Sequence, residues 1–320
     1  MDKIKVCFVG VGSIAKRHIK NLQELFHTQI TIDAFRSQKS NIPDKVISNT
    51  IHNSYDNLSE MPADYDVIFI TNPTRYHYET LVRFSDKGRH FFIEKPVFDS
   101  SDIDITALGL KKDSVYYVAC PLRYKKVLQY VKECVDLSQV LSARCISSSY
   151  LPEWRTGIDY RQTYSARKEL GGGVAIDLIH EWDYIQHLFG LPQMVYSMTG
   201  QVSDLEITSD DIAVYIAKYK KMFVELHLDY FGRTPIRELQ IFTREDTLIC
   251  DLIQNRIRFL KADKEIQFVE KRDDYQKKEL STFFDMINGR AENINSIETA
   301  LKTLRLAERN SLDREEQVDG

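Results

Sequence analysis

Long apolar runs are missing from this chain of 320 residues. No stretch approaches the roughly 18 consecutive apolar residues that are needed to cross a bilayer. The first residues, MDKIKVCFVG, read directly as a strand and show no signal-peptide pattern. We therefore expect a cytoplasmic protein without a membrane partner.

Paired cysteines and clustered positive charges are also missing. The five cysteines are odd in number and form no C-x-x-C motif, which favours free thiols in a reducing compartment. No histidines and cysteines lie together at the spacing of metal ligands, so we expect no metal site. The net charge is −4, and lysine and arginine are scattered as short pairs. Because no basic stripe can neutralise a run of phosphates, we expect no nucleic-acid partner.

The sequence does contain two distinct patterns of secondary structure. Up to Pro121, short apolar runs alternate with segments of helical periodicity, such as residues 14–26. The run DVIFIT at 66–71 is typical of a strand that is covered on both faces. This alternation predicts an α/β domain over residues 1–121 with a doubly wound parallel sheet.

After Pro121 the pattern changes. Helices are predicted at 123–135 and 174–189, and a strand at 140–150. From Val224 to Tyr230, apolar and polar residues alternate with a period of two. Consecutive short strands of this kind predict a mainly antiparallel sheet with one packed and one available face. We therefore expect a second, α+β domain over residues 122–320.

The stretch GVGSIA fills the G-x-G-x-x-G/A pattern of a dinucleotide-binding turn. Gly10 permits the tight turn, Gly12 lets a pyrophosphate approach the backbone, and Ala15 lets helix and strand pack closely. The following helix N-terminus offers unpaired N–H groups to the phosphates. We therefore expect cofactor contacts from Gly10, Gly12, Ser13, Ile14 and Ala15.

The end of the second strand indicates which dinucleotide is bound. An acidic residue there binds the ribose 2′-OH of NAD, whereas arginine accommodates the 2′-phosphate of NADP. Asp33 lies inside the strand, too early for this role, and the strand ends in Arg36 and Ser37. We therefore expect NADP in preference to NAD, with contacts from Arg36 and Ser37; an ordinary exposed arginine is the alternative.

Three further stretches complete a family resemblance: TNPTRYHYE from Thr71, EKPVF from Glu94 and GGGVAIDLIHEWD from Gly171. Together with the glycine loop, they resemble the Gfo/Idh/MocA family of NAD(P)-dependent oxidoreductases over nearly the whole chain. The resemblance implies an N-terminal Rossmann domain and a C-terminal domain with an open-faced sheet. It also implies a dehydrogenase or reductase that acts on CH–OH groups.

The resemblance also assigns residues by position. It implies that Lys95, Asp177 and His180 are the catalytic residues and that the peptide bond before Pro96 is often cis. Further cofactor contacts are implied for Thr71, Asn72, Pro73, His77, Glu94, Lys95 and Arg123. In many members the aspartate and histidine lie one residue further apart than here. Both spacings place the two side chains on one helix face.

The residue types fit hydride transfer. Histidine, with an unperturbed pKa near 6.5, suits the general acid/base role, so we assign it to His180. Lys95 would donate to the reacting oxygen and stabilise its developing charge, or would instead exchange the proton itself. Asp177 would bind a neighbouring hydroxyl and orient His180 or Lys95.

The segment from Tyr150 to Gly173 is rich in arginine and aromatic residues. Arginines bind carboxylate or phosphate, and aromatic rings cover sugar faces, although a solvated loop is the alternative. We expect a sugar carrying an anionic group, such as a nucleotide sugar or a sugar acid. The expected substrate contacts are Lys95, Arg155, Tyr160, Tyr164, Asp177 and His180.

Two other functions remain open. The first is an enzyme that retains its cofactor and recycles it within one turnover, as epimerase-like or hydrolase-like relatives do. The second is a non-catalytic sensor. The presence of Lys95, Asp177 and His180 argues against a sensor. Apolar residues on the open sheet face predict a homodimer or homotetramer.

Overall fold

The computed structural model describes residues 3–37 and 49–308, and these residues form two compact units. Of the described residues, unit 1 contains 3–37, 49–121 and 271–302, and unit 2 contains 122–270 and 303–308. The chain thus returns to unit 1 after residue 270, whereas the sequence pattern predicts one continuous second domain over residues 122–320.

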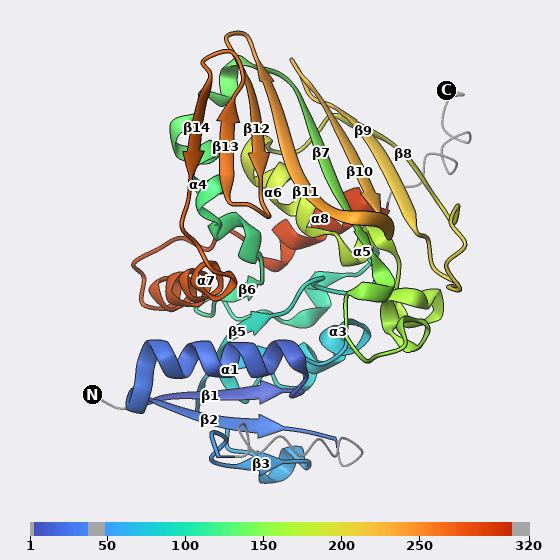
Figure 1. Cartoon of the computed structure of the whole chain (residues 1–320). Coiled ribbons are helices and arrows are strands. Elements are labelled where there is room, and N and C mark those ends of the chain that lie inside the picture. The colour runs from blue at the N-terminus through green and yellow to red at the C-terminus, as the bar shows by residue number, and fades with distance from the viewer. Residues whose placement is uncertain (1–2, 38–48, 309–320) are drawn as a thin grey trace, which may run out of the picture. The chain divides into compact units, whose positions relative to one another are not determined.

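Unit 1 is built on a six-stranded parallel sheet in the order β3-β2-β1-β4-β5-β6, which confirms the predicted Rossmann topology (Figure 1). The strands are β1 (Ile4–Val9), β2 (Ile30–Phe35), β3 (Ser54–Tyr55), β4 (Tyr65–Ile70), β5 (Gly88–Ile93) and β6 (Tyr116–Val118). The helices are α1 (Ser13–Phe26), α3 (His77–Arg83), α7 (Arg272–Ile287) and the start of α8 (Ile297–Glu308).

An aromatic ladder forms the core beneath α1 and α7. The rings of Phe8, Phe69, Phe92 and Tyr117 follow one another across four strands, with centroids 4.5, 5.0 and 5.4 Å apart. Phe283 of α7 lies edge-on to Phe92 at 5.3 Å. This burial explains why α7 packs with unit 1 although it follows unit 2 in the chain.

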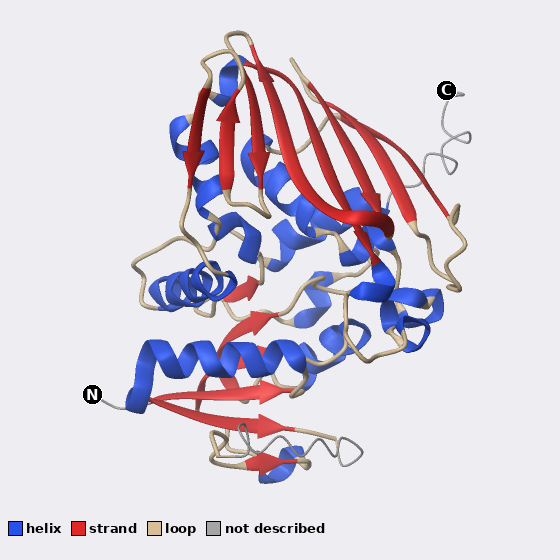
Figure 2. Ribbon diagram, viewed as in Figure 1, coloured by secondary structure: helices blue, strands red, loops and turns tan. Residues whose placement is uncertain are grey.

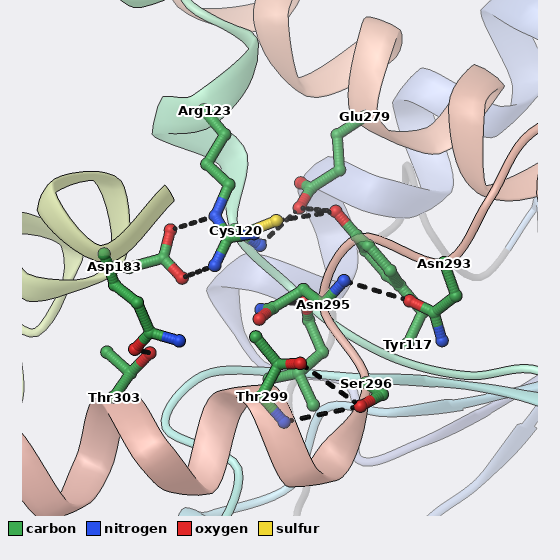
Figure 3. A network of polar contacts seen from close by, with 12 residues as sticks. Tyr117, Cys120, Arg123, Asp183, Glu279, Asn293, Asn295, Ser296, Thr299 and Thr303 are labelled. Atoms are coloured by element: carbon green, nitrogen blue, oxygen red, sulfur yellow. Dashed lines mark hydrogen bonds and ion pairs between the residues drawn. The ribbon is translucent and has the colours of Figure 1, made fainter. Parts of the chain in front are cut away.

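Polar contacts hold the returning segment to β6 (Figure 3). The buried carboxylate of Glu279 on α7 accepts hydrogen bonds from the Cys120 backbone N–H at 2.6 Å and the Tyr117 hydroxyl at 3.0 Å. Asn295 exchanges hydrogen bonds with the backbone of Val118, so the edge of β6 is covered.

Unit 2 contains an eight-stranded sheet in the order β14-β13-β12-β11-β7-β10-β9-β8 (Figure 2). All neighbouring strands are antiparallel except β7 and β10, so the predicted mainly antiparallel sheet is confirmed. The strands are β7 (Val140–Tyr150), β8 (Met194–Gly200), β9 (Ile212–Lys218), β10 (Phe223–Asp229), β11 (Phe231–Thr243), β12 (Thr247–Asp251), β13 (Arg256–Phe259) and β14 (Lys264–Gln267).

The helices of unit 2 are α4 (Lys126–Cys134), α5 (Val174–Asp177), α6 (His180–Phe189) and the end of α8. They gather on one face of the sheet, and among the described residues no helix covers the other face (Figure 1). On that face Tyr196 is 58 % and Met198 77 % exposed, so the expected open face is present.

The predicted helix over 174–189 is interrupted. Asp177 ends α5, a turn occupies residues 178–179, and His180 begins α6. Asp177 and His180 therefore do not share one continuous helix face, because the backbone leaves helical geometry at Leu178. Throughout the described residues, no helix combines the length and the apolar character of a membrane span.

Candidate cofactor and substrate sites

The glycine turn of unit 1 contains two glycines with different surroundings: Gly10 is packed against the protein, and Gly12 is not. Gly10 has φ +87°, and a Cβ there would lie 2.8 Å from the Asn72 Cα atom. Gly12 is exposed with φ −84°, and a Cβ there would meet no protein atom within 4 Å. The fold itself therefore requires glycine only at residue 10, and Gly12 leaves space beside the backbone for a ligand.

The turn after β4 interlocks with this glycine turn. The Thr71 hydroxyl donates to the Gly10 carbonyl at 2.6 Å, and the Asn72 side-chain amide donates to Thr80 at 2.7 Å. His77 is buried, and its ring nitrogens lie 3.0 Å from the Asn72 carbonyl and 3.1 Å from the Val97 carbonyl. Burial lowers the pKa of His77, and a neutral ring donates a hydrogen bond to only one of these two carbonyls at a time.

The turn after β5 carries Lys95, and the Lys95–Pro96 peptide bond is cis. Glu94 accepts a hydrogen bond from His18 Nε2 at 2.6 Å and one from the Lys95 backbone N–H at 3.2 Å. Burial alone would raise the pKa of Glu94, but the hydrogen bond from His18 and the charges of His18 and Lys95 outweigh it and lower the pKa. An ionised Glu94 thus links α1 to the turn that presents Lys95.

These turns fit a dinucleotide. They lie after β1, β4 and β5, at the carboxyl ends of parallel strands, where such folds bind nucleotides. Gly12 is the N-cap of α1, and no side chain caps this helix end, so the first-turn N–H groups have no capping side-chain acceptor. The buried Oδ1 atom of Asn72 has no hydrogen-bond partner among the described residues, which provides an acceptor for a ligand donor.

Asp33 lies inside β2, whereas Arg36 follows the end of this strand. Asp33 is buried, and its carboxylate accepts hydrogen bonds from the Asn53 backbone at 3.0 Å and the Tyr65 hydroxyl at 2.7 Å. Arg36 and Ser37 follow the last residue of the strand, and Ser37 is exposed. Asp33 therefore serves the fold, as its early position predicts.

In unit 2, Asp177 is buried and His180 is half-buried. The Asp177 carboxylate accepts a hydrogen bond from the Tyr230 hydroxyl at 2.6 Å. His187, later in α6, has its pKa lowered to about 4 by burial and by the charges of Arg123 and Lys132. His187 is therefore neutral at physiological pH, which leaves His180 as the acid/base candidate of this helix.

Arg123 makes a buried bidentate ion pair with Asp183 of α6, with N–O distances of 2.9 and 2.7 Å (Figure 3). Two nitrogens of its guanidinium are thus used inside unit 2. This pairing gives Arg123 a structural role, and its cofactor contact stays a prediction.

The segment between β7 and α5 is a series of short 3₁₀ turns. Arg155 is exposed, whereas the Tyr160 hydroxyl accepts a hydrogen bond from the Glu206 backbone at 3.2 Å. Arg161 pairs with Asp159 and, at 2.6 Å, with Glu206. The predicted substrate residues of this segment therefore differ: Arg155 and Tyr164 are exposed, whereas Tyr160 is hydrogen-bonded within unit 2.

Comparison with known proteins gives two family matches. Residues 4–117 match the model described as oxidoreductase family, NAD-binding Rossmann fold, and residues 128–248 match the Gfo/Idh/MocA C-terminal domain. The chain belongs to the Gfo/Idh/MocA family of oxidoreductases. The family resemblance inferred from the sequence motifs is confirmed.

A curated relative of this Gfo/Idh/MocA protein is the uncharacterized oxidoreductase YrbE of Bacillus subtilis, which is 27 % identical over 187 residues. That match covers 57 % of this chain and about half, 52 %, of the relative.

Solved structures share the whole fold at low identity. The UDP-N-acetylglucosamine 3-dehydrogenase GnnA of Acidithiobacillus ferrooxidans has a TM-score of 0.78 at 17 % identity and covers 96 % of both chains. The WlbA dehydrogenase of Bordetella pertussis, solved with NADH and UDP-GlcNAcA, also has a TM-score of 0.78 at 17 % identity, with 97 % coverage of both chains.

Sequence reasoning missed two residues that the structure places beside predicted site residues. His18 lies on the buried stripe of α1 with Ala15, Ile19 and Leu22, so helical periodicity could have predicted its burial but not its bond to Glu94. Tyr230 continues the alternating apolar residues of β10, which predicted an inward side chain but not the bond to Asp177.

Proposed function

We propose that this protein is an NADP-dependent oxidoreductase that transfers a hydride between the cofactor and a hydroxyl-bearing or keto carbon of a sugar derivative. The observation that carries the proposal is the set of interlocked turns after β1, β4 and β5 of unit 1. They combine the open backbone at Gly12 with a cis turn that presents Lys95. When bound, the nicotinamide would supply the hydride acceptor or donor.

Each site residue then has a chemical role. The first turn of α1 would hold the pyrophosphate, and Arg36 with Ser37 would hold the 2′-phosphate. Lys95 would stabilise negative charge on the reacting oxygen. As the hydride leaves the substrate carbon, His180 would take the hydroxyl proton, and it would return that proton in the reduction. Asp177 would accept a hydrogen bond from a neighbouring substrate hydroxyl.

An anionic sugar, such as a nucleotide sugar or a sugar acid, remains our proposed substrate. Arg155 supports this choice because it is exposed and lies over the Tyr164 ring at 5.9 Å. Two proteins of the same fold are associated with UDP-sugars: GnnA is a UDP-N-acetylglucosamine 3-dehydrogenase, and WlbA was solved with UDP-GlcNAcA. We further propose a cytoplasmic location, consistent with five free cysteines of which four are buried.

The test is absorbance at 340 nm with NADP or NAD and a panel of UDP-sugars, sugar acids and neutral sugars. We expect reduced cofactor to accumulate when an anionic sugar is the substrate. We also expect NADP to support this reaction at a lower cofactor concentration than NAD does. Cofactor that co-purifies and never accumulates in reduced form would instead indicate internal recycling. No binding of either cofactor would overturn the proposal.

We also propose that the open face of the unit 2 sheet joins two copies of the chain. Exposed apolar side chains cluster on three neighbouring strands: Tyr196, Met198, Ile216 and Phe223. Met198→Glu should shift the protein from dimer or tetramer to monomer in light scattering, because burying an unpaired charge is costly. Val269→Glu is the control, since Val269 is exposed outside this face. A wild-type monomer at micromolar concentration would contradict the proposal.

A further inference from the structure

His180 is the accessible side chain of an otherwise buried segment. Between residues 177 and 185 every residue is buried except His180, which is half-buried. Two positions later, the ring of the fully buried Trp182 lies edge-on to the Tyr215 ring of β9, with the centroids 5.3 Å apart. The first turn of α6 is therefore packed so tightly that it cannot rotate about the helix axis without moving its neighbours.

Two acidic side chains of the same turn are buried in ion pairs. The Glu181 carboxylate lies 2.7 Å from Nε of Arg237, which belongs to β11. Asp183 forms its bidentate pair with Arg123, in the 3₁₀ turn that precedes α4 (Figure 3). Each residue of an α-helix is rotated by about 100° from the one before it. The two ion pairs therefore flank His180 on either side of its helix face, and we call them the flanking pairs.

Stability alone gives little reason for two buried ion pairs in one helical turn. Each buried pair loses the hydration of both charges, and well-packed apolar side chains of similar size often stabilise a fold as well or better. An ion pair adds direction, because a guanidinium and a carboxylate bind in a defined geometry. Arg237 and Arg123 belong to separate elements of unit 2, so the flanking pairs fix this turn from two sides.

We propose that the residues of the flanking pairs are positioning residues, which hold the His180 ring toward the reacting hydroxyl of the substrate. This inference rests on the proposed function, in which His180 takes and returns the proton. Proton transfer requires the ring nitrogen to lie within hydrogen-bond reach of that hydroxyl. A displacement of about 1 Å lowers the rate up to about 100-fold. The flanking pairs act through His180 and need no contact with the substrate.

The double variant Glu181→Leu with Arg237→Met tests the proposal, because it replaces one flanking pair with apolar side chains of similar size. We expect kcat to fall about 10- to 100-fold and KM to stay within about twofold, since lost orientation weakens the transition state and not substrate binding. The matched control is Lys125→Met with Glu270→Leu, which removes a buried ion pair of unit 2 that does not involve α6. The control should keep kcat within about twofold of the wild type, whatever it does to thermal unfolding.

A second measurement needs no turnover. Carbon-13 NMR of protein labelled at the histidine rings follows the resonance that disappears in His180→Asn. We expect this resonance to shift or broaden in the double variant and to keep its wild-type position in the control. Glu181→Gln provides a milder variant, because it keeps the side-chain shape and leaves only the partly exposed Arg237 without its charge partner. It should fold even where the double variant does not, move the same resonance and lower kcat about threefold.

The outcomes separate a positioning role from a purely structural one. A folded double variant with wild-type kcat and an unmoved His180 resonance would overturn the proposal, as would Glu181→Gln with both quantities unchanged. A loss that appears only in KM would also overturn it. A wild-type protein without turnover would contradict the proposed function but leave the NMR comparison valid.

Discussion

The two units build their candidate sites in different ways. In unit 1, short turns after parallel strands are joined largely through backbone atoms, as in the Thr71 bond to Gly10 and the His77 contacts with two carbonyls. In unit 2, side chains from distant segments bond to one another, as in Tyr230 with Asp177 and Arg123 with Asp183. Backbone-built turns require particular residues at fixed spacing, and side-chain networks do not.

The largest expected effect tests whether both units serve the reaction. Lys95→Ala and His180→Ala should each lower kcat/KM by about 10³-fold, because one removes charge stabilisation and the other the proton carrier. Steady-state kinetics with the best substrate of the panel would measure this loss. Lys112→Ala, at an exposed lysine, is the control. Near-normal turnover in both site variants would remove this mechanism.

The next effect concerns the link within unit 1. His18→Asn should lower the free energy of unfolding by about 3 kcal/mol, because it leaves the Glu94 carboxylate without the hydrogen bond from His18 Nε2. Urea unfolding measures this change, and His52→Asn, at an exposed histidine, should change it by less than about 0.5 kcal/mol.

The contact between His18 and Glu94 also predicts how the stability of unit 1 changes with pH. Because the pKa of Glu94 is lowered from 4.5, its stabilisation is present above that pH and is lost as the pH falls through the folded-state value. His18→Asn should flatten this part of the acid dependence. An unfolding free energy equal to that of His52→Asn at every pH would show that the pair contributes nothing.

A smaller effect separates the two glycines. Gly10→Ala should cost about 2 kcal/mol of stability, because its positive φ and its contact with the Asn72 backbone exclude a Cβ. Gly12→Ala should cost only about 0.5 kcal/mol, since alanine is merely a poorer N-cap. Equal thermal unfolding of the two variants would refute this distinction.

The smallest effect concerns cofactor choice. Arg36→Ala should weaken NADPH binding about tenfold, or 1.4 kcal/mol, and leave NADH binding unchanged. Fluorescence titration gives both dissociation constants. A wild-type protein that already prefers NADH, with the preference retained in Arg36→Ala, would end the NADP proposal.

The sequence predicted most of unit 1 because its signals are local. The glycine spacing, the buried runs and the Glu94–Lys95–Pro96 turn all lie within a few residues of the elements they define. The pairing of His18 with Glu94 spans 76 residues, and no local pattern indicates it. The return of α7 to unit 1 rests on Phe283 and Glu279, whose partners Phe92 and Tyr117 belong to strands far earlier in the chain.

Unit 2 was less predictable for the same reason. Alternation predicted the sheet, but the parallel pairing of β7 with β10 depends on a contact between strands separated by more than 70 residues. No proline near Asp177 indicates the interruption between α5 and α6. The choice of Asp183 as the partner of Arg123, and of Tyr230 as the partner of Asp177, depends on packing that periodicity does not encode.

The contrast between the units is tested most directly by the NADPH dissociation constants of Gly12→Ala and His180→Ala, measured by fluorescence titration against the wild type. If the unit 1 turns hold the cofactor and the unit 2 side chains serve the substrate, Gly12→Ala should bind at least about tenfold more weakly and His180→Ala within about twofold of the wild type. Unchanged binding in Gly12→Ala, or an equal loss in both variants, would contradict this account.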